Sequence, residues 1–406
     1  VDGALELVVG RPVAHDAPRI PLLLAIAWQG FDAETGEVSF LLRPKRGDGP
    51  DFEDVEEAVA DEATESSSGS PPRSGLARFG PPVQQLEKKV WVLVLPSAAG
   101  ASPAESQAQG RAFLDLLGKH GVIRVDFSST YALSSASCGA GRAASVFLAR
   151  AERRRAGSGG DVAAAKLPTH DAQESGASEG VDSEVAVLVR AQGHPNVLRF
   201  QSLFWLDSSE HLMTSPWCIL SEYCAGGDLH SFVKLQALQE PAAQRLFLGV
   251  VRGIAHLHSR GILHRDMKPA NVLLRSDDEA VIGDFGSSCF VSDLEQARCE
   301  VLAVGRLAHT APEVIGRMGF SERSDMFGAG NILFFMFAQT FPFLGSSDRS
   351  TMRRLRQANL CLEKFPCFDR AGAELRELLS ELLHRVPMQR PKAEDALRHP
   401  WFDEPL

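Results

Sequence analysis

The segment from His264 to Gly286 constrains the fold and chemistry of this chain more than any other. It places three polar side chains of complementary chemistry next to two short apolar runs. Asp266 can accept a proton from a hydroxyl group, while Asn271 and Asp284 offer the oxygen atoms that Mg²⁺ prefers as ligands. All three lie within 19 residues. The apolar runs 272–274 and 280–282 are typical of short strands, which would hold these side chains rigidly.

The composition narrows the classes of protein. The 406 residues predict two or three domains, and a formal net charge of −10 argues against non-specific binding to nucleic-acid phosphates. Seven scattered cysteines without zinc-like spacing are typical of reduced thiols in an intracellular, cytoplasmic protein. The longest apolar run, 332–338, is too short to span a bilayer and predicts a buried helix. Because the chain begins with valine, we expect the true N-terminus and any targeting segment to lie upstream.

Residues 1–125 have the pattern of a mostly β region. Strand-like patches occur at 5–9, 20–28, 38–42 and 89–95, and residues 104–120 show helical spacing. Eight of the fifteen residues from 51 to 65 are acidic, and 66–82 is rich in Ser, Pro and Gly, so we expect a disordered insertion over 46–82. Shorter disordered segments are expected at 153–160 and 170–180. The order of elements resembles a pleckstrin-homology domain, which implies lipid or protein docking; a plain structural extension is the alternative.

The segment that begins His264-Arg265-Asp266 and ends Asp284-Phe285-Gly286 resembles the catalytic and magnesium loops of eukaryotic protein kinases. The resemblance implies an α+β, two-lobed kinase domain over 126–402, with a β-rich N-lobe at 131–222 and a helical C-lobe at 223–402. It implies ATP and Mg²⁺ as cofactors and a protein as substrate. Asp266 would orient the substrate hydroxyl and take its proton. Lys268 is typical of serine/threonine kinases and would neutralise charge on the transferring phosphoryl group.

Further motifs follow in the order of that family. Gly139, Gly141 and Val146 resemble the glycine-rich loop over the nucleotide phosphates, although Ala144 replaces its third glycine. Lys166 matches the phosphate-contacting lysine, and Glu184, on a helix-like stretch over 183–191, is its expected partner.

The strand before residue 224 resembles the hinge that holds the adenine ring. The backbone of Glu222 and Cys224 would bond the adenine edge, and Asp228 would accept from the ribose. An apolar slot would enclose the ring, as in most cofactor sites; its side chains would be Val146, Ala164 and Leu273.

The activation segment over 287–307 holds three serines and no threonine or tyrosine. Arg265 would pair with a phosphoserine at Ser287, Ser288 or Ser292; unmodified serines and phosphorylation-independent activity are the alternative. Arg306 stands where the family usually has threonine, and His309 where it has tyrosine or tryptophan.

Three further residues match structural positions of the family. Glu313 ends the activation segment and would pair with the buried Arg390, while Asp325 would accept backbone amides of the catalytic loop.

Three readings of function remain. The first is an active serine/threonine kinase that uses Mg²⁺ and ATP. The second is a pseudokinase or scaffold, which the departures at Ala144, Arg306 and His309 favour. The third places the main function in lipid or protein docking by residues 1–125. The presence of Lys166, Asp266, Asn271 and Asp284 favours the first reading over the second.

Overall fold

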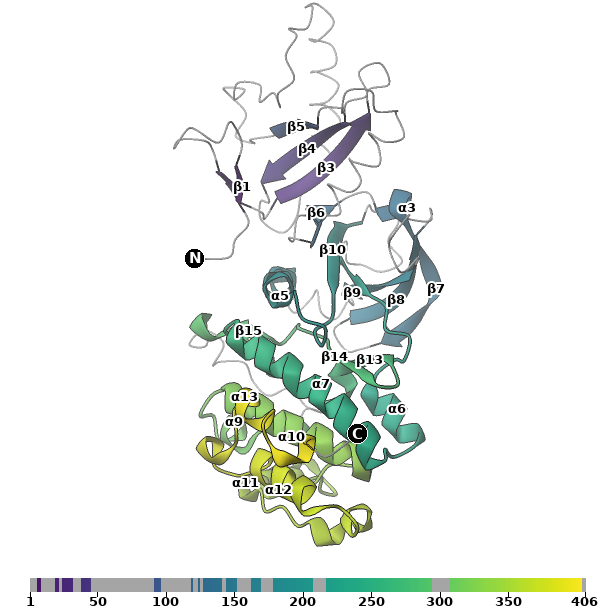
Figure 1. The fold of residues 1–406 in the computed structure, drawn as a ribbon. Coiled ribbons are helices and arrows are strands. Elements are labelled where there is room, and N and C mark those ends of the chain that lie inside the picture. Colours follow the sequence, from purple (N-terminus) through teal and green to yellow (C-terminus); the bar gives the residue numbers. More distant parts are fainter. Residues whose placement is uncertain are drawn as a thin grey trace, which may run out of the picture. The chain divides into compact units, whose positions relative to one another are not determined.

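The computed structural model describes thirteen segments of the chain, in two compact units. The sheet unit comprises 1–185 and 200–222, and the helical unit comprises 186–199 and 223–406. Together they give the mixed α+β architecture that the sequence predicts (Figure 1). The described segments are 6–8, 19–21, 24–31, 38–44, 91–95, 118–119, 123–124, 127–140, 144–151, 162–168, 178–206, 217–293 and 307–403.

The sheet unit contains a nine-stranded sheet in the order β5-β4-β3-β6-β10-β11-β9-β8-β7. Its pairs are antiparallel except that the short β6 runs parallel to both β3 and β10. Strands β1 (Glu6–Val8) and β2 (Arg19–Pro21) form a separate pair. The sheet strands are β3 (Leu24–Phe31), β4 (Val38–Pro44), β5 (Trp91–Leu95), β6 (Ile123–Arg124), β7 (Tyr131–Ala140), β8 (Ala144–Ala151), β9 (Val162–Pro168), β10 (Phe200–Trp205) and β11 (Trp217–Glu222).

Strand alternation decides which side chains of this sheet enter its core. In β9, Ala163, Ala165 and Leu167 are buried on one face, so Ala164 and Lys166 lie on the other. The core face also packs aromatic rings, with the Phe127 and Phe204 centroids 5.2 Å apart and edge-on. Phe127 belongs to the short helix α3 (Phe127–Thr130). The face opposite the core, which carries Ala164 and Lys166, is therefore the face where polar side chains can contact a ligand.

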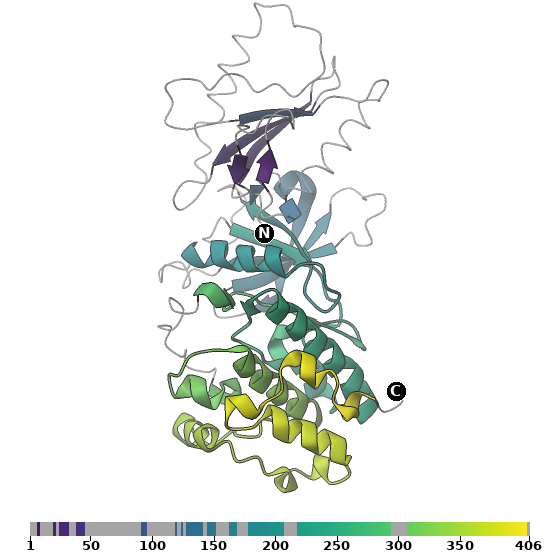
Figure 2. The same cartoon turned by 60° about the vertical axis from the view of Figure 1, so that its left-hand side comes forward.

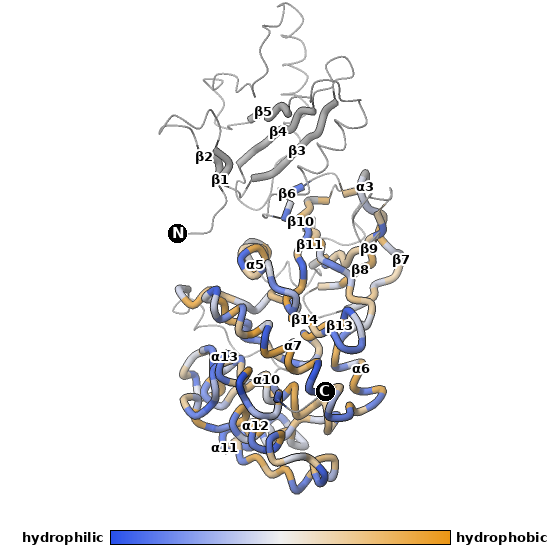
Figure 3. Tube along the Cα trace, in the orientation of Figure 1, coloured by the Kyte–Doolittle hydropathy of each residue, from blue (hydrophilic) through white to orange (hydrophobic). Residues whose placement is uncertain are grey.

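The helical unit is built on two long helices, α7 (Glu240–Ser259) and α10 (Glu322–Ala338). Every residue of α10 from Ser324 to Met336 is buried, which confirms the prediction of a buried helix there. In Figures 1 and 2, α7 runs beside α10, with α13 against α7. Figure 3 shows α11 mostly in the hydrophilic colour, which agrees with its burial, because only Thr351 and Leu355 of that helix are buried.

The smaller elements of this unit connect and cover the two long helices. Helix α5 (Ser178–Ala191) begins in the sheet unit and ends in the helical unit. Two short hairpins, β12–β15 and β13–β14, flank the loop that holds Asp266. Their bounds and those of the remaining helices are β12 (Ile262–Leu263), β13 (Val272–Ser276), β14 (Glu279–Ile282), β15 (Cys289–Phe290), α6 (Leu229–Leu235), α9 (Pro312–Ile315), α11 (Asp348–Gln357), α12 (Ala373–Leu382) and α13 (Ala393–Ala396).

Two sequence predictions need correction. The patch at 20–28 is divided between two strands of different sheets, because β2 pairs with β1 while β3 pairs with β4. The segment expected to be disordered at 170–180 includes Ser178–Gly180, which form the first turn of α5. Residues 170–177 and 153–160 lie outside the described part of the chain, as does 46–82.

The pleckstrin-homology resemblance gains no support. Of the closing helix expected over 104–120, only Gly118 and Lys119 are described. The strands β3, β4 and β5 instead share one sheet with β7–β11. Among the described helices, none is long and apolar enough to cross a membrane.

Candidate active site

The loop between β12 and β13 brings three predicted residues together in the helical unit. The Asp266 carboxylate accepts hydrogen bonds from Lys268 Nζ at 2.7 Å and from Asn271 Nδ2 at 3.1 Å. Asn271 Nδ2 also donates to the Asp266 carbonyl oxygen at 2.8 Å. Asp266 and Asn271 are buried, while Lys268 is partly exposed. A carboxylate, an ammonium group and an amide oxygen are thus held in one rigid turn.

Asp325 of helix α10 holds the loop between β12 and β13 in place. Its carboxylate accepts from the backbone N–H groups of His264 and Arg265, both at 2.9 Å, and contacts His258 Nε2 at 3.0 Å. Burial acts to raise the pKa of the Asp325 carboxyl, but the hydrogen bonds and charges of His258 and His264 outweigh it and hold that pKa below its usual value. Asp325 is therefore an anionic anchor for the loop.

Close packing of α10 against the loop depends on a glycine. A Cβ atom at Gly328 would lie 2.6 Å from Cβ of Met267, which is closer than real carbon atoms approach. The helix thus reaches the backbone beside Asp266 only because position 328 has no side chain.

Asp284 follows β14 and is tied to the same loop through its neighbours. The backbone N–H of Gly283 donates to the Asn271 carbonyl at 2.9 Å, and His264 Nε2 lies 3.0 Å from the Gly283 carbonyl oxygen. Phe285 is buried, whereas Asp284 is exposed and has a positive φ of 54°. A non-glycine residue in this left-handed region is uncommon and is often found at functional sites.

The donor set of Asn271 and Asp284 fits a magnesium ion. Both side-chain hydrogen bonds of Asn271 use its nitrogen, which leaves the side-chain carbonyl oxygen available as a metal ligand. Among the described residues, no group of three or more His, Cys, Asp or Glu side chains could hold a metal ion. Mg²⁺ commonly takes its other ligands from water and nucleotide phosphates.

The sheet unit contains the pair of Lys166 and Glu184. Lys166 Nζ donates to Glu184 Oε1 at 2.6 Å, and the two side chains are 24% and 11% exposed. Glu184 lies on α5, and the helix expected at 183–191 is confirmed as part of it. Val146 stands opposite both Gly139 and Lys166 in the sheet register, so Val146, Ala164 and Lys166 share the face away from the core.

The remaining residues that are predicted to contact the nucleotide differ in location. Glu222 is a buried residue of β11 and stands opposite Ala163. In the helical unit, Cys224 is buried and Leu273 bridges to Asp228. Gly141 lies outside the described residues.

Asp228 has a role that the hinge motif does not indicate. Its carboxylate caps α6, accepting from the Ser231 N–H at 2.9 Å and from the Ser231 hydroxyl at 2.8 Å. An Asp directly before a helical run was a signal for this cap. The ribose contact stays a prediction.

The serines of the activation segment differ in accessibility. Ser288 is buried, and its hydroxyl donates to the His264 carbonyl at 3.3 Å. Ser292 is exposed, and Ser287 is half-buried. Of the three, Ser292 is thus the most accessible to a modifying enzyme. The Arg265 guanidinium lies 4.8 Å from the centre of the Phe320 ring, and Arg306 lies outside the described residues.

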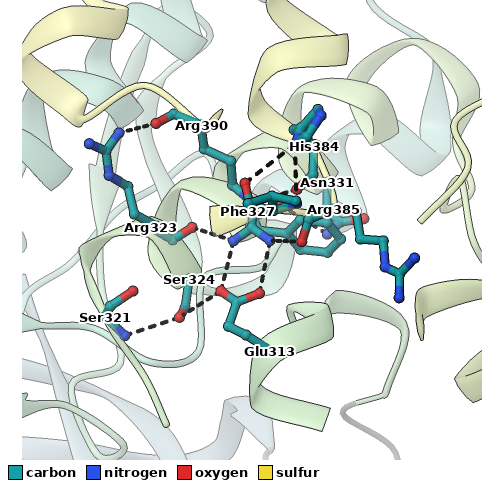
Figure 4. A network of polar contacts seen from close by, with 10 residues as sticks. Glu313, Ser321, Arg323, Ser324, Phe327, Asn331, His384, Arg385 and Arg390 are labelled. Carbon is teal, nitrogen blue, oxygen red and sulfur yellow. Dashed lines mark hydrogen bonds and ion pairs between the residues drawn. The ribbon is translucent and has the colours of Figure 1, made fainter. Parts of the chain in front are cut away.

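Glu313 and Arg390 form a buried two-point ion pair (Figure 4). Arg390 Nη1 and Nη2 donate to the two oxygens of Glu313 at 2.7 and 2.8 Å. Further donors of Arg390 bond the backbone carbonyls of Arg323 and His384 at 2.8 and 2.7 Å. The Ser324 hydroxyl also donates to Glu313, at 3.1 Å. Since every charge is met by a partner, the pair can remain buried.

His309 lies near Asp266 and Lys268 and makes an edge-on contact to Phe341, the ring centroids being 4.3 Å apart. Burial, followed by the positive charge of Lys268, lowers the pKa of His309 to about 4. Its Nδ1 is buried and has no hydrogen-bond partner in the described part of the chain. His309 is therefore a neutral imidazole near Asp266.

The motif spacing did not identify His258, Ser324 or Arg323, although they support Asp325, Glu313 and Arg390. Their partners lie 11 to 67 residues away along the chain, the largest separation being that of His258 from Asp325 and of Arg323 from Arg390. A local pattern carries no signal for such a contact.

Comparison with known proteins agrees with this arrangement. A family model described as the protein kinase domain matches residues 134–402, more than half of the chain. CBL-interacting protein kinase 28 of Oryza sativa subsp. japonica is 30% identical over 254 residues, which cover 62% of this chain and 55% of the relative.

Two further relatives show the same pattern of partial coverage. CBL-interacting protein kinase 22 of the same species is 32% identical over 232 residues, covering 55% of this chain and 49% of the relative. Serine/threonine-protein kinase 17A of Oryctolagus cuniculus is 30% identical over 227 residues, covering 54% of each. The chain thus spans about half the length of the curated relatives that it matches.

Proposed function

Because this chain belongs to the protein kinase family, we propose that it transfers the γ-phosphoryl group of ATP to serine or threonine hydroxyls of protein substrates. The observation that carries the proposal is the single turn in which Lys268 and Asn271 both bond the Asp266 carboxylate. The matched relatives include proteins named as serine/threonine kinases, which supports the substrate class.

Asp266 supplies the acceptor for the substrate proton. Its carboxylate, fixed by two donors, is held in one orientation, and it can take the proton of a hydroxyl group at an oxygen. Phosphoryl transfer passes through a loose transition state, so positioning matters more than the strength of the base. Lys268 Nζ holds the carboxylate and brings a positive charge to the side where negative charge develops.

Asn271 and Asp284 would hold Mg²⁺, and Lys166, oriented by Glu184, would contact nucleotide phosphate. When bound, ATP would supply the phosphoryl group and Mg²⁺ would neutralise part of its charge. The face of the sheet that carries Val146 and Ala164 offers apolar contacts to the adenine ring.

The decisive experiment is phosphorylation of a degenerate peptide library with Mg²⁺ and ATP. We expect phosphate on serine and threonine, and a fall of about a hundredfold or more in Asp266→Asn, because this change removes the proton acceptor but keeps the side-chain shape. Asp395→Asn is the matched control, since that carboxylate lies at an exposed surface position.

Two outcomes contradict the proposal. Equal rates in the parent and in Asp266→Asn would assign the phosphate to a contaminant. Stabilisation of the parent by Mg²⁺ and ATP without any transfer would instead identify a nucleotide-binding scaffold.

A further inference from the structure

A stretch of chain just before the region that matches the family contributes to the core of the sheet unit. The family model matches residues 134–402, and the described residues of 118–131, which we call the leading segment, precede it. Phe127 and Tyr131 of the leading segment are buried in one cluster with side chains of β8, β9, β10 and β11. The core of this sheet is therefore completed by residues outside the matched region.

The leading segment buries a cation against strand β10. Arg124 stands opposite Phe204 in the parallel register of β6 and β10. The Arg124 guanidinium lies 4.9 Å from the centre of the Phe204 ring, and only 2% of the residue is exposed. Arginine is rarely buried to this degree unless favourable partners surround its charge, and the face of an aromatic ring is one such partner. Phe204 thus stabilises the buried cation.

Two aromatic rings of the leading segment also pack on Phe204. The ring centroids of Phe127 and Tyr131 lie 5.2 and 6.1 Å from that of Phe204, and both contacts are edge-on. The rings of Phe127 and Tyr131 are themselves 5.7 Å apart. Edge-on pairs at these distances are favourable beyond the burial of their surface. One ring of β10 is therefore held by a cation and two rings of the leading segment.

A glycine lets the leading segment approach β10 closely. A Cβ atom at Gly118 would collide with the Ser202 hydroxyl and would lie 3.2 Å from Cδ of Arg124. Ser202 is a buried residue of β10, and its hydroxyl donates to the Gln201 carbonyl at 2.6 Å. The backbone at position 118 can cover Ser202 and Arg124 only because it carries no side chain.

Packing on this face of the sheet bears on Lys166, which lies on the opposite face of β9. Ala165 and Leu167 flank Lys166 in the sequence and are fully buried in the cluster that contains Phe204. Strand β9 pairs with β11, which in turn pairs with β10. Because protein interiors are closely packed, a displaced Phe204 moves its neighbours. The position of Lys166 relative to Glu184 thus depends on how the core face is filled.

We propose that Arg124 is a positioning residue, which holds Phe204 and thereby fixes the part of the sheet that presents Lys166 to Glu184. Arg124 acts through packing. The contact of Lys166 with nucleotide phosphate rests on the proposed function, but the geometry of its pair with Glu184 does not. An arginine outside the matched region thereby sets the geometry of an ion pair inside it.

The test measures how fast an amine-reactive ester labels Lys166 in the full chain, followed by peptide mass spectrometry. An ammonium group held by a carboxylate reacts more slowly than a released one. We expect Arg124→Met to raise the labelling rate of Lys166 about threefold, because the variant keeps a long apolar side chain but loses the cation over the ring. Lys268 is the internal control, since it is 22% exposed against 24% for Lys166 and is likewise paired with a carboxylate. Its rate should not change.

Further variants separate the charge from the packing. Arg124→Lys keeps a cation near the ring and should raise the Lys166 rate less than Arg124→Met does. In a Phe204→Leu background, which lacks the ring, Arg124→Met should change the rate less than it does in the parent. Arg150→Met, at an exposed position of β8, is the matched control for the loss of an arginine and should have no effect.

Two results overturn the proposal. An unchanged Lys166 rate in Arg124→Met, with a folded circular dichroism spectrum, would limit Arg124 to a role in stability. An equal rise at Lys166 and Lys268 would show a general loosening of the chain. Should Arg124→Met fail to fold, Phe204→Leu compared with the parent gives the same two outcomes. Because labelling requires neither ATP nor phosphoryl transfer, its result is independent of whether the proposed function holds.

Discussion

The two ion pairs of this protein differ in what surrounds them. In the sheet unit, Lys166 Nζ donates to Glu184 Oε1 at 2.6 Å, and both side chains keep partial access to solvent. In the helical unit, Glu313 and Arg390 make two contacts, are almost fully buried, and are supported by backbone carbonyls and a serine hydroxyl. A partly exposed pair can exchange its partner for a ligand at lower cost, whereas a fully buried pair cannot lose a member without leaving an unpaired charge. The first is suited to function and the second to stability.

The largest effect that tests this difference between the two ion pairs is expected when Arg390 is replaced. Arg390→Leu leaves the Glu313 carboxylate buried without its cation, so we expect the free energy of unfolding to fall by about 3–5 kcal/mol. Urea unfolding followed by circular dichroism measures the loss. In Arg398→Ala, which removes the exposed pair with Asp395, we expect a change of no more than about 0.5 kcal/mol. Similar values for the two variants would contradict the assigned difference between buried and exposed pairs.

The second test concerns the half-exposed pair. Lys166→Met should lower the rate of phosphoryl transfer by about a hundredfold or more, because a charge that contacts phosphate is lost. The free energy of unfolding should change by less than about 1 kcal/mol, since the pair is partly solvated. Peptide phosphorylation and urea unfolding of the same sample measure both quantities. Lys364→Met, at an exposed position, is the control.

A stability loss in Lys166→Met as large as that of Arg390→Leu would give Lys166 a structural role. Unchanged transfer would remove it from the proposed nucleotide contacts.

The third test uses His309, whose pKa is lowered by burial and by the positive charge of Lys268, although the charge of Asp266 acts in the opposite direction. Because its pKa in the folded protein is about 4 and the ordinary value is 6.5, the unfolded chain binds a proton at intermediate pH and the folded chain does not. The contribution of His309 to stability therefore falls as pH drops below about 6.5, by about 2 kcal/mol at pH 5.

We expect His309→Phe to lack this part of the pH dependence. Urea unfolding of both proteins between pH 7 and pH 5 gives the comparison, and the carboxyl Asp325 contributes equally to each. Parallel pH curves for the two proteins would show that His309 titrates normally in the folded state.

Local patterns predicted much of the helical unit. The apolar runs 272–274 and 280–282 lie in β13 and β14, which pair as a hairpin beside the catalytic loop. The run 332–338 lies in the buried helix α10. These predictions hold because each element buries one face or its whole surface, and the spacing of apolar residues records that burial directly.

Sequence patterns were less informative where the contacting residues are distant in the chain, or where one apolar run is divided between two strands that pair with different neighbours. The patch 20–28 is uniformly strand-like, so nothing in it marks the division between β2 and β3. Packing also decides that Ser288 is buried with its hydroxyl bonded to the His264 carbonyl. It likewise leaves His309 Nδ1 without a hydrogen-bond partner among the described residues. Alternation tells which face a residue occupies but not what covers that face.

The sequence by itself predicted that Asp266, Lys268 and Asn271 act together, because they lie within a few residues of one another and their contacts are local. It also determined the family, through motifs whose order and spacing are specific. Tertiary structure alone decided that Asp325 is also held by His258 and that Ser288 is buried. The physical reason is distance along the chain: a local motif specifies residue types and short-range bonds, while burial and long-range partners depend on how separate elements pack.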